Sequence, residues 1–348
     1  MKYPVASFVL LVSLLSLITP AQTSTQTRPR RVAVTKDVPV EEVSAGDVVR
    51  INTTLVTVPV SVLDRQGRFV YGLRREDFHL FEDGVEQSIV HFEPTEMPFT
   101  VALLLDTSAS TRFDLEEIKE AAIAFAKQLR PQDRVLVVTF NDEVYLLTEA
   151  TNDFYRIREV IETGARSGQS TRLYDAVELV IKKRLNKIQG RKAMVLFTDG
   201  VDTASLRATG RSTLREVEEL DALIYPIKYD TKEYVSNMRG GSIWTLPALI
   251  FGGPVAAGST DADYVRADRY LQGLADRTGG RLYSANDPVQ LKQAFTSIAE
   301  EIRRQYRLGY YPRNATDNGE RHSIKVNVNR PDIAVRSRNT YIHRASVK

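Results

Sequence analysis

The chain has 348 residues, 43% of them hydrophobic, which is enough to build one large core or two smaller ones. Its 47 basic and 44 acidic residues give a formal net charge of +3 with both signs interspersed, so the charge gives no reason to propose nucleic acid as a partner. Cysteine is absent, which excludes disulfides, zinc–thiolate sites, a cysteine nucleophile and an anchor carried by a lipidated cysteine.

Residues 1–21 are predicted to be a cleavable export signal. Lys2 supplies a positive start, residues 8–18 form an apolar core, and residues 19–21 offer small side chains for cleavage. The apolar run is shorter than the roughly 20 residues needed to span a bilayer, so we expect cleavage rather than membrane insertion. The polar, aperiodic residues 22–47 are predicted to be a linker. The sequence therefore predicts an exported protein, which is periplasmic, cell-surface or secreted.

Residues 48–97 and 304–348 are both predicted to form short antiparallel strands. The first segment is expected to hold strands at 51–64, at 68–73 and on both sides of the Asp83-Gly84 hairpin turn. The tail holds three runs of the same alternating character, YRLGYY, HSIKVNV and AVRSRNTYI. We expect the two ends of the chain to pair in one small β-sandwich, with another domain inserted between them.

Residues 98–303 alternate strands with helices, which is typical of a doubly wound, mostly parallel α/β sheet. Buried strands are expected at 101–105, 134–140, 193–198 and 223–228, with an edge strand at 144–147 and a last strand at 281–284. Helices are expected at 114–129, 153–162, 173–188, 213–222, 267–276 and 288–303. The insertion at 230–266 has two open interpretations, a surface loop packed on its own domain and a loop that contacts a partner.

Oxygen-bearing side chains follow two of the predicted parallel strands and precede one helix. Asp106, Ser108 and Ser110 come after the strand VALLL, Asp199 follows AMVLFT, and Thr171 lies in the polar loop SGQST. The carboxyl ends of parallel strands meet at one edge of a sheet, so these five side chains are expected to converge. Mg²⁺ takes six oxygen ligands and is usually held by one or two carboxylates. The sequence therefore predicts a site for Mg²⁺, with Mn²⁺ or Ca²⁺ as alternatives, whose shell is completed by a Glu or Asp of a protein partner.

Each of these residues also has a purely structural interpretation. Ser110 or Asp114 could cap the following helix, and Thr171 could cap the helix that begins at Leu173. Asp199-Gly200 is a common turn pair. A DxSxS string alone is a weak signal, whereas three segments at one sheet edge in this order are a much stronger one.

The pattern resembles a von Willebrand factor type A domain that carries a metal-ion-dependent adhesion site. In that family DxSxS follows the first strand, a Thr precedes a middle helix and an Asp follows a later strand. The segments TRLYDAV and LFTDG also match the family's sequence around the Thr and the Asp. The resemblance covers about residues 99–303 and implies a Rossmann-like fold with the five residues above as metal ligands. The flanks, VTVPVSVLDRQGRFVYGLRREDFHLFEDG and YRLGYYP, are similar to those of exported bacterial proteins of the acidobacterial vWA-related group. The insertion at 230–266 departs from a minimal domain of this type.

These features favour a non-enzymatic adhesion or protein-interaction module that uses a divalent cation. One alternative is a metal-dependent hydrolase or phosphotransferase, because carboxylates at this edge of an α/β sheet also support such chemistry. Against it, Asp106 is followed by hydroxyls rather than by a second carboxylate, and the chain has no GxSxG, P-loop or GxGxxG after a strand. Another alternative is a structural component of an envelope assembly, in which the ion only stabilises the loops. We expect the protein not to be an enzyme.

Overall fold

A six-stranded mixed sheet forms the centre of the α/β domain in the computed structural model, which describes residues 55–108, 115–229, 260–313 and 319–342. In spatial order, the strands are β10 (Tyr283–Ala285), β9 (Leu223–Tyr229), β8 (Arg191–Thr198), β5 (Phe99–Asp106), β6 (Arg134–Phe140) and β7 (Val144–Thr151). All neighbours are parallel except β6 and the edge strand β7. Every residue of β5 is buried, as expected for a parallel strand covered on both faces.

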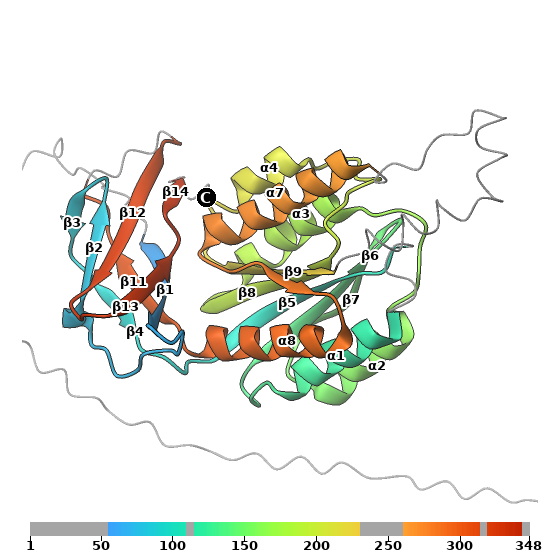
Figure 1. Cartoon of the computed structure of the whole chain (residues 1–348), viewed down its shortest axis with the longest axis horizontal. Helices are drawn as coiled ribbons and strands as arrows, with labels where there is room; N and C mark the ends of the chain where they lie inside the picture. The colour runs from blue at the N-terminus through green and yellow to red at the C-terminus, as the bar shows by residue number, and fades with distance from the viewer. Residues whose placement is uncertain (1–54, 109–114, 230–259, 314–318, 343–348) are drawn as a thin grey trace, which may run out of the picture. The chain divides into compact units, whose positions relative to one another are not determined.

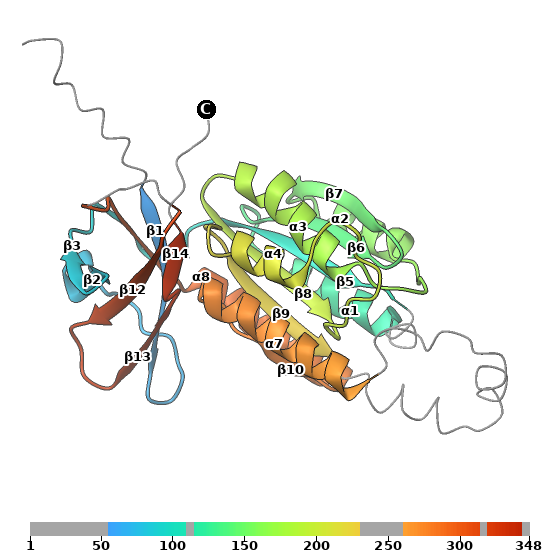
Figure 2. The ribbon, with the colours of Figure 1, turned by 90° about the horizontal axis from the view of Figure 1, so that it is seen from above.

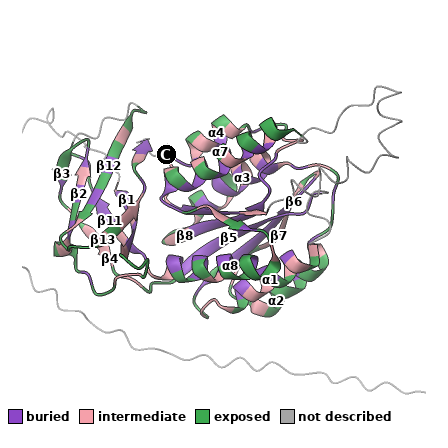
Figure 3. Cartoon of the chain, in the orientation of Figure 1, coloured by how far each residue is buried: buried purple, intermediate pink, exposed green. Residues whose placement is uncertain are grey.

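Helices of the described part of the chain cover both faces of this sheet (Figure 1). One face packs against α1 (Leu115–Lys127), α2 (Phe154–Gly164) and α8 (Pro288–Arg303). The other face packs against α3 (Leu173–Lys183), α4 (Gly210–Glu216) and α7 (Asp261–Thr278). The helices turn their buried residues toward the sheet and their exposed residues outward (Figure 3). This is the two-sided burial that the apolar strands and amphipathic helices predict.

Two four-stranded antiparallel sheets combine strands from both ends of the chain. The first has the order β13 (Ile333–Ser337), β1 (Val56–Asp64), β11 (Tyr306–Tyr310) and β4 (His91–Glu93). The second has the order β14 (Thr340–Ile342), β12 (Arg321–Val328), β2 (Phe78–Glu82) and β3 (Val85–Gln87).

The strand β1 lies between two C-terminal strands, with Val58 opposite Leu308 and Val62 opposite Val335. Both sheets contribute to one hydrophobic core, to which β2 supplies Leu80. The fold-class prediction is therefore confirmed: a doubly wound, mostly parallel α/β sheet is flanked by a small antiparallel sandwich made from N-terminal and C-terminal strands.

One predicted strand of the sandwich has a different form. Residues 68–73 do not form a strand, and within them an isolated bridge joins Phe69 to Leu63. The expected signal peptide (1–21), the linker (22–47) and most of the insertion lie outside the described residues, so these predictions stay predictions. Within the described part of the chain, no helix has both the length and the apolar character needed to cross a membrane.

Helix boundaries differ where a capping residue was overlooked in the sequence. The helix expected at 267–276 begins at Asp261, because the Thr260 hydroxyl accepts a hydrogen bond from the backbone N–H of Asp263. In the same way, Thr209 caps α4, so the helix expected at 213–222 covers 210–216 instead. The helix expected at 173–188 ends at 183 and continues after Arg184 as a short 3₁₀ helix, η3 (Leu185–Lys187). Asp287 caps α8, because its side chain accepts a hydrogen bond from the backbone N–H of Gln290.

A buried carboxylate joins the sandwich to the α/β domain. Glu301 of α8 is 1% exposed, and its Oε1 accepts a hydrogen bond from Tyr225 of β9 at 3.0 Å. The same carboxylate forms an ion pair with Arg336 of β13 and lies 3.5 Å from the hydroxyl of Ser61 in β1. A buried carboxylate needs such partners, because it has lost its water shell.

We expect Glu301→Ala to destabilise the protein by about 3 kcal/mol, the lower end of the effect of breaking a buried ion pair. The lower end applies because the Arg336 side chain is 27% exposed and keeps some contact with water. Chemical denaturation would measure this change. The matched control is Glu300→Ala, which removes an exposed carboxylate from the next position of α8. Equal stability of the two variants would contradict a role of the buried carboxylate in joining the domains.

Candidate functional site

Three loop segments bring the predicted ligand residues to the carboxyl edge of the central sheet. Asp106 is the last residue of β5, and Asp199 directly follows the adjacent parallel strand β8. Thr171 lies just before α3. The exposed fractions of Asp106, Ser108, Thr171 and Asp199 are 0%, 1%, 4% and 2%, so all four residues are buried. Ser110, the fifth predicted ligand, lies outside the described residues.

The Asp106 carboxylate is fixed by two hydrogen bonds. Its Oδ1 accepts from the backbone N–H of Ser108 at 3.0 Å, and its Oδ2 accepts from the hydroxyl of Thr198 at 2.6 Å. The Thr198 hydroxyl in turn accepts from the backbone N–H of Gly200 at 3.0 Å. Asp199 is oriented in the same manner, since its Oδ1 accepts from the backbone N–H of Val201 at 3.0 Å. Both carboxylates are therefore held in place by groups at the ends of β5 and β8 and by the residues that follow them.

The two carboxylates interact electrostatically. Burial raises the pKa of Asp106, the charge of Asp199 raises it further, and the hydrogen bonds from Thr198 and Ser108 lower it, with a net rise from 3.8 to about 7. Two acids that cannot both ionise easily in a buried place are stabilised by a positive charge between or beside them. The oxygen-only character of the surrounding side chains suits a hard divalent cation rather than a soft metal.

Thr171 does not cap the helix that follows it, contrary to one of its two sequence interpretations. The N-cap of α3 is Arg172, and no side chain makes a capping hydrogen bond there. Instead, the backbone of Thr171 is bonded to the loop after Asp199. Its N–H donates to the hydroxyl of Thr203 at 2.9 Å, and its carbonyl accepts from the N–H groups of Thr203 and Ala204 at 3.0 Å. The Thr171 hydroxyl is thereby held at the same edge as the carboxylates without having a capping role.

Two residues that sequence reasoning missed hold the loop that carries Thr171. The Asp142 carboxylate accepts from the backbone N–H of Ser170 at 2.8 Å and from its hydroxyl at 2.6 Å. The bond from the Ser170 hydroxyl contributes most to keeping the pKa of Asp142 below its ordinary value, and the backbone N–H bond acts in the same direction. Asn141 donates from Nδ2 to the backbone carbonyl of Arg166 at 2.8 Å, and its own backbone carbonyl accepts from the N–H of Arg172 at 3.0 Å. Their position directly after β6, at the same edge as Asp106, was the only signal available in the sequence.

Asp175 holds the loop that follows Asp199. Its carboxylate accepts from the backbone N–H groups of Leu206, Arg207 and Ala208 at 2.9, 3.0 and 2.8 Å. Burial acts to raise the pKa of Asp175, but these three N–H groups outweigh it and hold the pKa below its ordinary value. The carboxylate of Asp175 thus holds the backbone of this loop, while the side chain of Leu206 is 76% exposed.

A second cluster of possible ligands lies in the sandwich, where sequence reasoning did not expect one. Among the described residues, Glu82, Asp83 and His322 form the one group of three His, Cys, Asp or Glu side chains whose ligand atoms all lie within 4.8 Å of one another. The ring of His322 contacts Asp83 at 2.8 Å, and Tyr341 donates a hydrogen bond to Glu82. These groups satisfy one another, so the cluster has a complete structural explanation.

Comparison with known proteins is consistent with this geometry. Residues 101–201 match the family model described as von Willebrand factor type A domain. This part of the α/β domain is therefore similar to a von Willebrand factor type A domain. The match includes β5, the loop of Thr171 and the strand that leads to Asp199. No curated protein sequence matches the chain.

Solved structures similar to this chain also include type A domains. The domain of the type V pili tip protein Mfa5 from Porphyromonas gingivalis has 13% identity and a TM-score of 0.45, with 60% of this chain and 96% of that chain covered. A von Willebrand factor type A protein from Catenulispora acidiphila has 10% identity and a TM-score of 0.44, with 85% and 76% covered. The conserved hypothetical protein BatB from Bacteroides thetaiotaomicron has 15% identity and a TM-score of 0.41, with 58% and 99% covered.

The raised pKa of Asp106 predicts a pH-dependent stability of the type A domain in EDTA. The folded-state pKa is about 7 against an ordinary 3.8, so the protonated carboxyl stabilises the fold at low pH. This contribution is lost as the pH rises toward 7, by at most about 1.4 kcal/mol per pH unit. Asp106→Asn removes the titrating group and is expected to flatten the profile between pH 5 and about 7. Denaturation at several pH values in EDTA would measure both profiles, and parallel profiles would contradict the prediction.

Gly168 is predicted to allow the close approach of the Thr171 loop to the end of β6. A Cβ atom at this position would lie 2.6 Å from the Asn141 side chain and 2.8 Å from the Asp142 carboxylate. Gly168→Ala is therefore expected to destabilise the protein by about 1–3 kcal/mol, as overpacking usually does. The exposed neighbour Ser167→Ala is the control, with an expected change within about 0.5 kcal/mol. Thermal denaturation of both variants tests the prediction, which fails if the two variants unfold alike.

Proposed function

We propose that this protein is an exported protein-interaction module whose type A domain binds a divalent cation and, through it, an acidic residue of a partner. The observation that carries the proposal is the pair of buried carboxylates at one sheet edge, Asp106 and Asp199. Their interaction helps raise the pKa of Asp106 to about 7. A carboxylate pair of this kind is stabilised when a cation replaces the proton, and two carboxylates are the number that Mg²⁺ usually takes from a protein.

The proposed ligand set is Asp106, Ser108, Ser110, Thr171 and Asp199, some of them acting through water. Mg²⁺ is the preferred ion, and Mn²⁺ and Ca²⁺ are the alternatives, because all the donors are oxygens. Two carboxylates and three hydroxyls give the set a charge that only balances the ion. A further carboxylate from a partner then adds a strong ligand at little cost in repulsion. This makes the site a metal-ion-dependent adhesion site in the sense of the family that the sequence resembles.

The surroundings of the site support an interaction role. The loop after Asp199 is fixed by three backbone hydrogen bonds to Asp175, so its ordering entropy is already lost before a partner binds. Leu206 of this loop is 76% exposed and offers an apolar contact to a partner. A rigid loop with one exposed apolar side chain is suited to dock against a protein surface.

Export is the second part of the proposal. It rests on the signal-like residues 1–21 and on the similarity of the flanking strands to those of exported acidobacterial vWA-related proteins. A periplasmic or external location would supply millimolar divalent cations and protein partners on cell surfaces. Mass spectrometry of the mature N-terminus, expressed in a Gram-negative host, would show whether cleavage follows Ala21.

Adding millimolar Mg²⁺ or Mn²⁺ to the EDTA-treated protein is expected to stabilise it. The gain should reach about 2.7 kcal/mol at 100 times the Kd, provided that the unfolded chain binds no metal. Asp106→Ala should abolish the gain, because it removes a ligand from the centre of the site. Thermal or chemical denaturation with and without the ion measures this difference.

The matched control for Asp106→Ala is Asp276→Ala, which removes an exposed carboxylate from α7. This variant should keep the full metal-induced gain. Two results would sink the proposed metal site: an equal gain in wild type and Asp106→Ala, or no ion-dependent change in the wild-type protein at any concentration up to 10 mM, ~10 times the ion level at which weak extracellular sites bind.

A further inference from the structure

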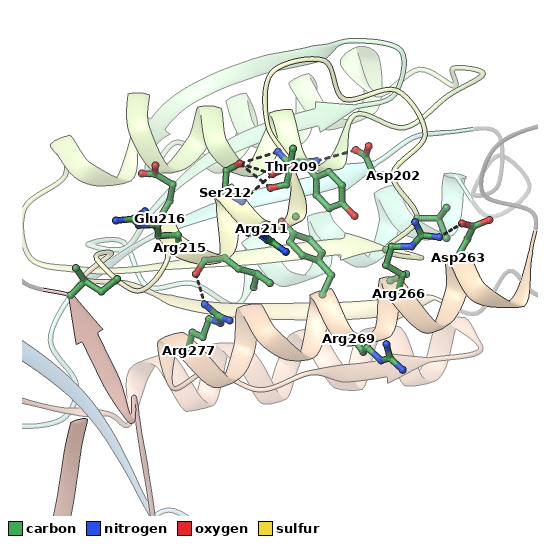
Figure 4. A pocket seen from close by; sticks show the side chains of 18 of the residues that line it. Asp202, Thr209, Arg211, Ser212, Arg215, Glu216, Asp263, Arg266, Arg269 and Arg277 are labelled. Atoms are coloured by element: carbon green, nitrogen blue, oxygen red, sulfur yellow. Dashed lines mark hydrogen bonds and ion pairs between the residues drawn. The ribbon is translucent and has the colours of Figure 1, made fainter. Parts of the chain in front are cut away.

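The helices α4 and α7 lie side by side (Figure 2). A groove lies between them, on the face of the sheet opposite α1 and α8 (Figure 4). Its volume is about 1340 Å³, and one end is lined by Gly200, Val201 and Asp202, the residues that follow Asp199. Its apolar lining residues include Val201, Leu214 and Ala267. The groove therefore begins beside the carboxylate edge and runs away from it along two helices.

Arginine dominates the walls of this groove. Six arginines line it: Arg211, Arg215, Arg266, Arg269, Arg277 and Arg321. The lining carboxylates are Asp202, Glu216 and Asp263. Figure 4 shows the labelled arginines arriving from both α4 and α7.

The three lining carboxylates already have partners. Asp202 accepts hydrogen bonds from Ser205 and from the backbone N–H of Tyr174. Glu216 lies 3.4 Å from Lys182, and Asp263 accepts from Arg266 at 2.7 Å. Only one of these three carboxylates, that of Asp263, therefore pairs with an arginine of the groove.

Two more arginines of the groove share the carboxylate of Glu218, a buried residue that does not itself line the groove. The side chain of Glu218 is 2% exposed and forms ion pairs with both Arg277 and Arg321. One negative charge faces two positive charges, so this cluster keeps an excess of positive charge. A further acidic group at the groove would be attracted to it.

Among the described residues, the side chains of three of these arginines have no ion-pair or hydrogen-bond partner: Arg211, Arg215 and Arg269. Arg211 and Arg215 are four residues apart on α4, so their side chains lie next to each other on one face of the helix. Arg269 belongs to α7, on the other side of the groove. Guanidinium groups on both walls can each bind a carboxylate with two parallel hydrogen bonds.

We propose that this groove binds an acidic, extended segment of a protein partner. The unpaired arginine side chains would bind Asp or Glu side chains of the segment, and the apolar lining residues would contact the aliphatic parts of those side chains. None of these contacts needs a metal ion, so the proposal stands whether or not the carboxylate edge holds one.

A peptide fits the groove better than a nucleic acid does. Single-stranded nucleic acids bind by stacking bases on accessible aromatic rings. The aromatic rings here, Tyr174 and Tyr270, pack edge-to-face against each other at 4.8 Å, and the Tyr270 hydroxyl is bonded to Thr213. The carboxylates on the walls would also repel a continuous phosphate backbone, whereas a peptide can place its acids opposite the arginines only.

The test uses the full protein, a fluorescein-labelled deca-glutamate peptide and fluorescence anisotropy in EDTA. Arg211→Ala/Arg215→Ala/Arg269→Ala should weaken binding at least tenfold. The charge-matched control, Lys183→Ala/Lys187→Ala/Lys292→Ala, removes three exposed cations that do not line the groove and should change the Kd less than twofold. Circular dichroism and the melting temperature verify that both triple variants fold.

Each other outcome overturns the proposal. An equal loss in both triple variants would mean non-specific attraction to a basic surface, and wild-type binding of a neutral Gly-Ser decapeptide with the same affinity would exclude charge recognition. Tighter binding of a labelled ten-nucleotide oligothymidylate, lost in the groove variant, would assign the groove to nucleic acid. Because the titration is carried out in EDTA, its result is independent of the metal-stabilisation experiment, and either proposal can fail alone.

Discussion

The burial of two acids at one edge of a parallel sheet is the constraint on which the functional end of this protein depends. Asp106 and Asp199 are exposed by 0% and 2%. Each lies at the end of a central strand, so neither side chain can move into solvent unless that strand end moves. Desolvation makes ionisation of both unfavourable, so the fold must supply hydrogen-bond donors, a proton or a cation. The donors from Thr198 and Ser108 are insufficient, since the pKa of Asp106 still rises. A structure optimised only for stability would place apolar residues there, and the acids therefore indicate function.

The surrounding loops are organised by other carboxylates that act as anchors. Asp142 holds the loop of Thr171, and Asp175 holds the loop after Asp199, in each case through backbone N–H groups. The lowered pKa values of these two acids contrast with the raised pKa of Asp106. The direction of the shift thus separates anchors, whose charge is satisfied by the fold, from a candidate ligand, whose charge is not.

The sequence was sufficient to predict the fold class and the convergence of the carboxylates. Buried strands such as β5 have a nearly continuous apolar run, and parallel topology then brings their ends to one edge. It was not sufficient for residues 68–73, whose alternating pattern suits a strand but which pair with β1 only through the isolated bridge from Phe69 to Leu63. The roles of Asp142 and Gly168 and the arginine groove depend on contacts between segments distant in the chain, such as α4 with α7. No local pattern encodes those contacts.

The loop after Asp199 lies between the two proposed binding surfaces of the α/β domain. Gly200 has a positive φ of 85°, and a Cβ there would lie 2.8 Å from Leu271 of α7. The residue next to a candidate metal ligand is therefore packed directly on a helix that forms one wall of the groove. A ligand that shifts α7 must move this loop or be resisted by it, and an ion bound to Asp199 would stiffen the same loop. Coupling of this kind is reciprocal: whatever the ion contributes to peptide affinity, the peptide must contribute to ion affinity. The close packing at Gly200 is what makes such coupling physically direct.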